Sequence, residues 1–476
     1  MNLRRTKIVA TLGPSTDDPA MLERIFEAGV NVVRINFSHG ADKVQSRIDA
    51  VRACAAKLSL TIGILADLQG PKIRIARFIE GSITLVPGAQ FILDAGLDAD
   101  MGTEEMVGID YKELVDDVAF GDILLLDDGR IVLTVQEVTA PRIICRVEVG
   151  GPLSNHKGIN RLGGGLSAEA FTEKDQRDMK VAVAAGVDYI AISFPRDAAD
   201  MQYAREMLES MNGKAGLIAK IERAEAIEHI DEIINASDGV MVARGDLAVE
   251  IGAAQVPGAQ KEIIRRARAL DKPVITATQM MESMIENTIP TRAEVSDVAN
   301  AVLDLTDAVM LSAESAIGAH PDKVVDTMSR ICIAAERERE TQISGHRMEM
   351  RFARIDEAIA MAALYTANHL SIKAVITLTE SGATPLMMSR IKTSIPIYGL
   401  SRHLDTLGKM TLYRDVYPMF FDFTKVPIER INASSVNVLK DQGLVEDEDL
   451  IILTKGDHIG MHGGTNSMKI IRVGEV

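Results

Sequence analysis

Over most of residues 1–342, short apolar runs alternate with stretches in which apolar residues recur every three to four positions. The short runs are rich in β-branched residues, which is typical of strands buried on both faces, and the periodic stretches are typical of amphipathic helices. Eight strands are expected, at residues 7–13, 31–38, 62–70, 187–193, 216–222, 239–246, 273–278 and 308–314. Eight successive β-then-α units favour a (β/α)₈ TIM barrel, with an open doubly wound sheet as the alternative.

One segment, from about residue 71 to 166, breaks this rhythm. Apolar and polar residues alternate there instead, as in residues 129–138 and 141–151. Such alternation is typical of strands with one buried face, and Asp128-Gly129 is typical of a hairpin turn. An all-β insertion after the third barrel strand is therefore expected. It would lie over the carboxyl-terminal face of the barrel, where it can act as a lid.

A second α/β pattern begins after about residue 343. A helical stretch at 354–370 precedes expected strands at 373–379, 395–401, 416–421 and 449–456. This order predicts a small open sheet flanked by helices. The chain is thus expected to contain three domains: a catalytic barrel (1–70 and 167–342), an inserted β lid (71–166) and a C-terminal α/β domain (343–476).

The net charge restricts the classes of partner that the protein is expected to bind. The 476 residues carry a formal net charge of −16. A strongly acidic surface repels nucleic acid and anionic membranes, so neither is an expected partner. If the substrates are anions too, local cations must bind them, either clustered Arg and Lys or bound metal.

The compartment expected from the sequence is the cytoplasm. No apolar run approaches the roughly 18 residues that span a bilayer. The first residues run into a strand-like segment with no cleavage motif of the signal-peptide type. Cys54, Cys145 and Cys332 are widely spaced and form neither a zinc pattern nor a disulfide framework.

Polar side chains gather at the ends of the predicted barrel strands, where the active site of a TIM barrel lies. A buried strand needs no such residues for packing alone, so their recurrence on seven of the eight strands indicates a site. In chain order they are Arg34, Asn36, Ser38 and His39; Asp67, Lys72 and Arg74; Ser193; Lys220 and Glu222; Arg244 and Asp246; Thr278; and Glu314.

Lys220, Glu222 and Asp246 are the strongest candidates for chemistry. Lys220 and Glu222 are two residues apart on a strand, so their side chains share one face. This pair alone is equally consistent with a buried ion pair. Asp246 follows the next strand, and two carboxylates from adjacent strands suit Mg²⁺, which keeps positions open for substrate oxygens. The alternative for Asp246 is a helix N-cap.

Arg34, Arg74 and Lys220 would supply the local cations that the net charge demands. Arginine suits two-point contact with phosphate or carboxylate oxygens, although a surface ion pair is the alternative for each. Asn36 and Ser38, with Asp67 on the next strand, suit a weakly held cation or plain hydrogen bonding.

These residues stand in segments that resemble the pyruvate kinase family over essentially the whole chain. TATQMMESM followed by PTRAEVSDVANAV, within residues 273–302, is the most specific. The other matching segments, in the order of that family, are TKIVATLGPST (6–16), VVRINFSHG (32–40), ADLQGPKIR (66–74), AKIE (219–222), DGVMVARGDLAVEIG (238–252), AVMLSAESAIGAHP (308–321) and GGTN (463–466).

The resemblance implies a barrel, a lid and a regulatory C-terminal domain, and the final step of glycolysis: phosphoryl transfer from phosphoenolpyruvate to ADP, giving pyruvate and ATP. It implies Mg²⁺ on Glu222 and Asp246, with Mn²⁺ as a substitute, and a second Mg²⁺ arriving with ADP. Lys220, Arg34 and Thr278 are the implied catalytic residues. The implied substrate-binding residues are Arg34, Lys220, Gly245, Asp246, Thr278 and Arg74. The implied nucleotide-binding residues are Asn36, His39, Arg74 and Lys157.

One departure from the family concerns the monovalent cation. Many pyruvate kinases hold K⁺ at positions matching Asn36, Ser38, Asp67 and Leu68, with Glu at the position of Lys72. Here Leu68 offers only its backbone carbonyl, and Lys72 is itself a cation. We therefore expect a K⁺-independent enzyme, the alternative being that Lys72 points into solvent.

The expected effector site is the strand-to-helix turn at residues 379–385. Its hydroxyls and backbone N–H groups suit a phosphate, with a plain N-cap as the alternative; the residues are Thr379, Ser381, Gly382 and Thr384. Glu380 disfavours a second phosphate, so a monophosphorylated sugar or nucleotide is expected rather than fructose 1,6-bisphosphate. The resemblance also implies a homotetramer.

Two rival functions are disfavoured by the same residues. A barrel lyase would use Lys220 as a Schiff-base amine, which requires a lowered pKa, whereas neighbouring carboxylates raise it. A catalytically silent metabolite sensor would lack some of Lys220, Glu222, Asp246 and Thr278, and the chain retains all four.

Overall fold

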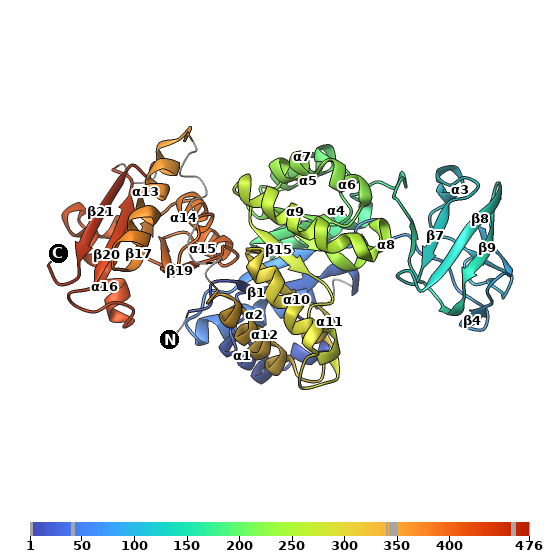
Figure 1. Cartoon of the computed structure of the whole chain (residues 1–476), viewed down its shortest axis with the longest axis horizontal. Coiled ribbons are helices and arrows are strands. Elements are labelled where there is room, and N and C mark those ends of the chain that lie inside the picture. Colours follow the sequence, from blue (N-terminus) through green and yellow to red (C-terminus); the bar gives the residue numbers. More distant parts are fainter. Residues whose placement is uncertain (1–2, 40–42, 339–340, 342–350, 458–462, 476) are drawn as a thin grey trace.

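The computed structural model describes residues 3–39, 43–338, 341, 351–457 and 463–475. Three bodies lie in a row along the longest axis of the molecule (Figure 1). The barrel occupies the middle, the β-rich insertion one end and the C-terminal sheet the other. The expected boundary between residues 342 and 343 lies outside the described residues.

Eight parallel strands close the central barrel, which confirms the TIM barrel and excludes the open sheet. In spatial order they are β1 (Lys7–Thr11), β16 (Ala308–Leu311), β15 (Val274–Ala277), β14 (Gly239–Ala243), β13 (Gly216–Ile221), β12 (Tyr189–Ile192), β3 (Gly63–Asp67) and β2 (Val32–Asn36). Strands enclosed by a helical layer are buried on both faces, which explains their continuous apolar runs.

An outer layer of helices covers the barrel (Figure 1). Its larger members are α1 (Pro19–Glu27), α2 (Val44–Lys57), α4 (Glu173–Ala184), α5 (Ala198–Ser210), α7 (Ile230–Ala236), α9 (Val256–Ala269), α10 (Arg292–Leu303) and α12 (Pro321–Ala335). Short helices begin directly at strand ends: α6 (Ala224–Glu228), α8 (Arg244–Ile251) and α11 (Ala313–Ala316). The strand expected at 239–246 therefore ends at Ala243, because the chain turns into α8 at Arg244.

The insertion folds as two antiparallel-rich sheets around its own apolar core, with one short helix, α3 (Leu114–Asp117). One sheet pairs β4 (Ser82–Leu85) with β10 (Gly151–Ser154). The other has the order β11 (Ile159–Arg161), β7 (Ile123–Leu126), β8 (Ile131–Thr139), β9 (Arg142–Val149), β5 (Gln90–Asp94) and β6 (Met106–Gly108). Asp127, Asp128 and Gly129 form the β7–β8 turn with φ of 51°, 56° and 83°, the left-handed conformation that Asp and Gly tolerate.

The C-terminal domain is an open five-stranded sheet. Its order is β19 (Val416–Phe420), β18 (Ile397–Ser401), β17 (Ile372–Leu378), β20 (Leu450–Lys455) and β21 (Ser467–Arg472). Its helices are α13 (Ile355–His369), α14 (Ala383–Ser389), α15 (Leu404–Met410) and α16 (Ile431–Asp441). The edge strand β21 was not predicted, because an exposed antiparallel edge carries too few buried apolar residues to stand out.

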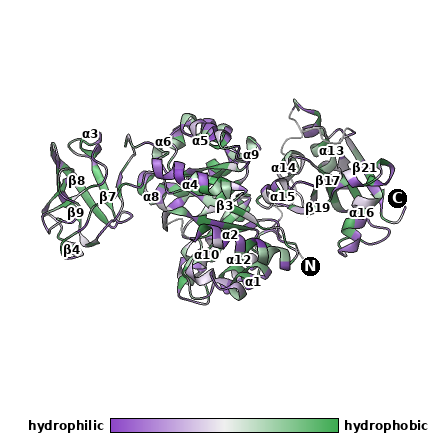
Figure 2. Cartoon of the chain, turned by 180° about the vertical axis from the view of Figure 1, so that it is seen from behind, coloured by the Kyte–Doolittle hydropathy of each residue, from purple (hydrophilic) through white to green (hydrophobic). Residues whose placement is uncertain are grey.

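The C-terminal domain closes the amino-terminal end of the barrel. Barrel residues such as Leu65 and Met241 share one apolar core with Ala363 of α13 and Met388 of α14. Apolar residues concentrate within each of the three bodies (Figure 2). With that end closed, the opposite end, which faces the insertion, is the one left for a site. Among the described residues, none of the helices has the length and apolar character to cross a membrane.

Candidate active site

The polar side chains expected at the barrel mouth converge around one buried acid, Asp67, at the end of β3. Arg34 of β2 places Nε 2.6 Å from Asp67 Oδ2, and Lys220 of β13 places Nζ 3.2 Å from Oδ1. Burial opposes ionisation of Asp67, but the charges of Lys220 and Arg34 outweigh it and hold the pKa of this carboxyl below its ordinary value. Asp67 therefore fixes two cations at the mouth.

Lys220 is held from three sides. Besides Asp67, its ammonium lies 2.9 Å from Glu222 Oε1 and donates to Ser193 Oγ at 2.7 Å. Burial alone would lower the pKa of Lys220, but Asp67 and Glu222 outweigh it and raise this pKa above its ordinary value. An amine that stays protonated is a fixed point charge and a poor Schiff-base nucleophile, so the geometry disfavours the lyase alternative.

Glu222 and Asp246 form a pair of carboxylates beside this cation. Glu222 is buried, and its Oε2 accepts the backbone N–H of Phe194 at 3.0 Å. Burial, and then the negative charge of Asp246, raise the pKa of Glu222 to about 7. Asp246 is partly exposed and lies 3.3 Å from Lys72 Nζ. Two mutually repelling carboxylates that leave room for further oxygens fit a divalent cation of the Mg²⁺ type.

Thr278 directly follows β15 and has an uncommon backbone conformation. Its φ is +67°, and that of Gln279 is +54°, a region costly for non-glycine residues and frequent at functional sites. Thr278 Oγ1 accepts the backbone N–H of Gly245 at 2.8 Å and donates to the carbonyl of Ala277 at 2.6 Å. Arg244 donates to the carbonyls of both Ala277 and Thr278, so it holds this loop in place.

The expected nucleotide-binding residues contact other groups, although Asn36 of β2 stands next to Asp67 of β3 in the register of the barrel. Arg74 donates to the carbonyl of His156 at 2.9 Å, and Lys157 lies 2.7 Å from Asp127, so both pair with residues of the insertion. Asn36 Oδ1 accepts the backbone N–H of Ser38 at 2.9 Å. His39 ends a 3₁₀ turn, Phe37–His39, and its side chain lies outside the described residues.

The expected monovalent-cation residues are only partly available in this arrangement. Both carboxylate oxygens of Asp67 face cations, and the carbonyl of Leu68 accepts the Ser193 hydroxyl at 2.6 Å. Lys72 does not point freely into solvent: it pairs with Asp246 and is 29% exposed. Its ammonium therefore lies at the mouth, beside one of the candidate metal ligands.

Thr11 was not among the residues expected at the mouth, whereas Ser193 and Glu314 were expected there without an assigned role. Thr11 of β1 accepts a hydrogen bond from Arg34 at 3.0 Å, although no polar end was assigned to that strand. Ser193 was noted without a role, and it connects Lys220 to Leu68. Glu314 has a structural role, since its oxygens accept the backbone N–H groups of Met281 and Ser312. The only sequence signal for Thr11 is its position at the end of β1.

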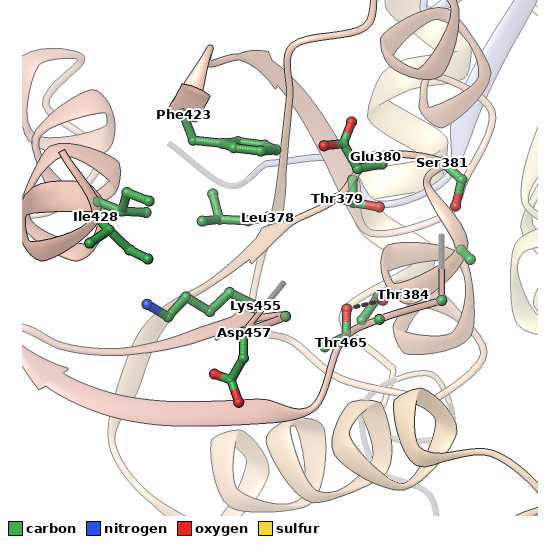
Figure 3. Close-up of a pocket in the computed structure, with 15 residues that line it drawn as sticks. Leu378, Thr379, Glu380, Ser381, Thr384, Phe423, Ile428, Lys455, Asp457 and Thr465 are labelled. Atoms are coloured by element: carbon green, nitrogen blue, oxygen red, sulfur yellow. Dashed lines mark hydrogen bonds between the residues drawn. The ribbon is translucent and has the colours of Figure 1, made fainter. Parts of the chain in front are cut away.

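The expected effector turn borders a pocket of about 120 Å³ in the C-terminal domain, shown in Figure 3. Thr379, Ser381 and Thr384 line it, and Thr384 Oγ1 lies 2.7 Å from Thr465 Oγ1. Lys455 lines the pocket across from Glu380 (Figure 3). Gly382, with φ of +81°, instead donates its N–H to Thr379 Oγ1 and shapes the turn.

Glu380 is neutralised by its own neighbours. Its carboxylate lies 3.2 Å from Arg402 and 2.5 Å from His403, and it is 8% exposed. The Glu380 carboxylate therefore pairs with side chains of its own domain, and its repulsion of a second phosphate is weaker than the sequence alone suggests.

Comparison with known proteins gives the family. Residues 3–325 match the family profile described as the pyruvate kinase barrel domain, and residues 357–471 match the profile described as the pyruvate kinase alpha/beta domain. Pyruvate kinase II of Salmonella typhimurium is 54% identical over 99% of both chains. A pyruvate kinase of Buchnera aphidicola is 53% identical over 99% of both, and one of Haemophilus influenzae is 52% identical over 95% of this chain and 96% of its own.

Proposed function

The chain belongs to the pyruvate kinase family of phosphotransferases, and we propose that it transfers the phosphoryl group of phosphoenolpyruvate to ADP in a Mg²⁺-dependent reaction, giving pyruvate and ATP. The observation that carries the proposal is the buried group of Arg34, Lys220, Asp67 and Glu222 at the barrel mouth. It fixes two cations, Arg34 and Lys220, at the mouth of a chain of net charge −16 that must accept anionic substrates.

Glu222 and Asp246 would hold the metal. A bound Mg²⁺ supplies charge neutralisation and a template for substrate oxygens, and Mn²⁺ has the same preference for oxygen ligands. The elevated pKa of Glu222, caused mainly by burial, supports this role because a cation removes the cost of ionising that carboxyl.

Lys220 and Arg34 would stabilise the phosphoryl group during transfer. Phosphoryl transfer needs little covalent chemistry from the protein, so most catalysis comes from positioning and fixed charge. Asp67 holds Arg34 and Lys220 in position before the substrate binds. Little reorganisation of these cations is therefore needed when negative charge moves from the oxygen of phosphoenolpyruvate to that of ADP. The permanently protonated ammonium of Lys220 suits a charge that must be present throughout.

Thr278 and Gly245 would line the substrate's carboxylate and enolate face. The Gly245 N–H donates a hydrogen bond to the Thr278 hydroxyl, and this hydroxyl would belong to the relay that delivers a proton to the enolate. The positive φ of Thr278 supports a functional role, because such strain of about 1–3 kcal/mol persists only where surroundings maintain it.

The insertion would close over the nucleotide. Arg74 and Lys157 bring positive charge to the insertion, where they contact His156 and Asp127. In the sequence, Asn36 and His39 come at and just after the end of the second barrel strand. The proposed division is a barrel domain of 1–70 and 167–342, a lid of 71–166 and a regulatory domain of 343–476. A second Mg²⁺ would arrive with ADP.

Independence from K⁺ is part of the proposal. Lys72 brings a fixed ammonium to the mouth, 3.3 Å from Asp246. With Asp67 already paired to two cations and Leu68 lacking a side-chain oxygen, little is left to attract a further monovalent ion. Lys72 would supply the charge that K⁺ supplies elsewhere.

Regulation would act through the C-terminal pocket. Hydroxyls of Thr379, Ser381 and Thr384 and the nearby Lys455 suit a phosphorylated small molecule. Because Glu380 pairs with Arg402 and His403, it does not by itself exclude a second phosphate. The proposed ligand is still monophosphorylated, because Lys455 is the single cation among the described residues that line this pocket.

A homotetramer in the cytoplasm completes the proposal. An apolar groove of about 960 Å³ lies between α10 and α12, lined by Ile289, Val295 and Leu303 among others. Ile289 is 74% exposed, which is costly for an aliphatic side chain unless a second chain covers it.

The test is pyruvate formation from phosphoenolpyruvate, ADP and Mg²⁺, coupled to lactate dehydrogenase, with K⁺ present or replaced by tetramethylammonium. The coupling enzyme is assayed alone under both conditions. Activity in both supports the proposed reaction and its independence from K⁺, and activity only with K⁺ removes the role of Lys72. Absence of pyruvate in both, with folded protein and phosphorylated effectors added, overturns the assignment and favours a metabolite sensor.

A further inference from the structure

The insertion returns to the barrel along residues 159–168, the return segment, and two acidic side chains of the barrel hold it. Asn160 donates from Nδ2 to Glu250 Oε1 at 3.1 Å, and the Gly163 N–H donates to the Glu250 carbonyl at 2.9 Å. The Gly165 N–H donates to the Glu225 carboxylate. Residues 160–165 of the return segment are therefore attached through the carboxylates of Glu250 on α8 and Glu225 on α6, and through the main-chain carbonyl of Glu250.

The second half of the return segment is attached differently. Arg223 is buried and donates to the carbonyls of Leu166 and Ala168 at 3.0 and 3.2 Å. A guanidinium keeps its charge at every physiological pH, so this attachment does not titrate. Any pH dependence of the hold must therefore come from the carboxylates.

Glu250 is the unusual member of the group. It is 4% exposed, and its Oε2 has no hydrogen-bond partner among the described residues. The same is true of Oε2 of Glu225, and both residues border one small cavity of about 20 Å³ between the insertion and the barrel. A proton on Glu250 would supply the donor that these two oxygens lack.

The surroundings of Glu250 favour that proton. Burial foremost, and also the charge of Glu225, raise the pKa of Glu250 to about 7, while the Asn160 hydrogen bond, the charge of Arg223 and the backbone N–H of Ala224 act in the opposite direction. Lys72 and Asp246 border the same cavity and pair with each other. Above pH 7, Glu250 ionises beside Glu225, and repulsion between two poorly solvated carboxylates weakens the hold on the return segment.

We propose that Glu250 is a positioning residue for the insertion, which it holds in the nucleotide-binding position through Asn160 and the return segment. Glu250 lies one helical turn after Asp246 on α8, so the insertion is fastened to the helix that carries a proposed metal ligand. The inference rests on the proposed function in one respect, namely that the insertion covers the nucleotide.

The first measurement is the dissociation constant of Mg·ADP by calorimetry at about pH 6 and about pH 8. Glu250→Gln mimics the protonated acid, and Glu104→Gln, on an exposed loop of the insertion, is the matched control. The ratio of variant to wild-type constants is compared, so that titration of ADP itself cancels. We expect Glu250→Gln to bind Mg·ADP about fivefold more tightly than wild type at the higher pH, where it removes the charge that faces Glu225, and equally at the lower pH, with kcat within about twofold. Equal ratios at both values would overturn the inference.

The second measurement is hydrogen exchange of the return-segment amides at about pH 8, where intrinsic rates are equal for all variants. Slower exchange in Glu250→Gln than in wild type and Glu104→Gln supports the inference, and equal exchange refutes it. Exchange requires no ligand or turnover, so it decides the matter even for a protein that makes no pyruvate. If Glu250→Gln does not fold, Asn160→Leu is expected to exchange faster than wild type, and unchanged exchange refutes the role.

Discussion

The side chains at the barrel mouth act as fixed charges because each is held by an opposite one. Lys220 lies between Asp67 and Glu222, and Arg34 contacts the second oxygen of Asp67. Removing one member of such a buried group leaves its partner without compensation, which costs more than the loss of a surface pair. Substitutions here should therefore act mainly on the chemical step.

Lys220→Met is expected to lower kcat by about 10³-fold, with a much smaller change in KM for phosphoenolpyruvate, because a charge that matters most in the transition state is lost. The coupled pyruvate assay measures this. Lys214→Met removes a lysine that is 81% exposed and should leave kcat unchanged. A Lys220→Met enzyme within tenfold of wild type would remove Lys220 from catalysis.

Lys72→Glu is expected to create a requirement for K⁺. Activity without K⁺ should fall by about tenfold or more and return when K⁺ is added, because a carboxylate replaces the ammonium beside Asp246. Lys72→Met removes the charge without adding a ligand, so K⁺ should restore less activity. Equal activity of Lys72→Glu with and without K⁺ would show that Lys72 does not replace the ion.

At the level of elements, the barrel and the C-terminal domain are joined through close backbone contact at α15. Gly408 of α15 faces Asp188, which precedes β12, and Asp188 Oδ2 accepts the backbone N–H of Ile64. A Cβ placed on Gly408 would lie 1.8 Å from Asp188 Oδ1, nearer than any atom can approach. Glycine at this position is required by packing and not by backbone conformation.

Gly408→Ala is expected to destabilise the fold by about 1–3 kcal/mol and lower the melting temperature of the domain contact in calorimetry. Gly258→Ala on α9 is the matched control, since nothing lies within 4 Å of its new methyl group and alanine favours a helix. The double variant Asp188→Ala with Gly408→Ala should lose less than the sum of the single changes. A Gly408→Ala protein as stable as Gly258→Ala would contradict the contact.

At the level of the whole molecule, an acidic surface and an exposed apolar groove indicate different partners. The net charge of −16 keeps copies apart at long range, whereas the groove between α10 and α12 offers apolar area for association. Short-range burial can outweigh screened repulsion at physiological ionic strength, where charges act over about 8 Å.

Ile289→Glu is expected to break the proposed homotetramer into smaller species, because it places a charge in the apolar groove. Light scattering after size-exclusion chromatography gives the mass. Phe120→Glu, at a residue 78% exposed on the insertion, should leave the mass unchanged. An unaltered mass for Ile289→Glu would place the interface elsewhere.

Most of the fold followed from the sequence because local rules and tertiary structure agree there. Continuous apolar runs predicted all eight barrel strands, and the loss of the helical period predicted the β-rich insertion. Where the two disagree, the prediction failed: β21 lies at an exposed edge, and the strand expected to reach residue 246 ends at Ala243. Edge pairing and the start of α8 depend on neighbours that are remote in sequence.

The sequence by itself determined the family, the barrel and the charged residue types at the strand ends, because each is written in short segments of the chain. Only the tertiary structure decided which charges meet. Asp67 lies 153 residues before Lys220 in the chain and yet contacts it at 3.2 Å, and Glu250 of α8 in the barrel accepts a hydrogen bond from Asn160, which lies 90 residues earlier in the chain. A closed barrel brings distant strand ends to one mouth, and burial there sets the pKa of each group through neighbours that no local pattern reveals.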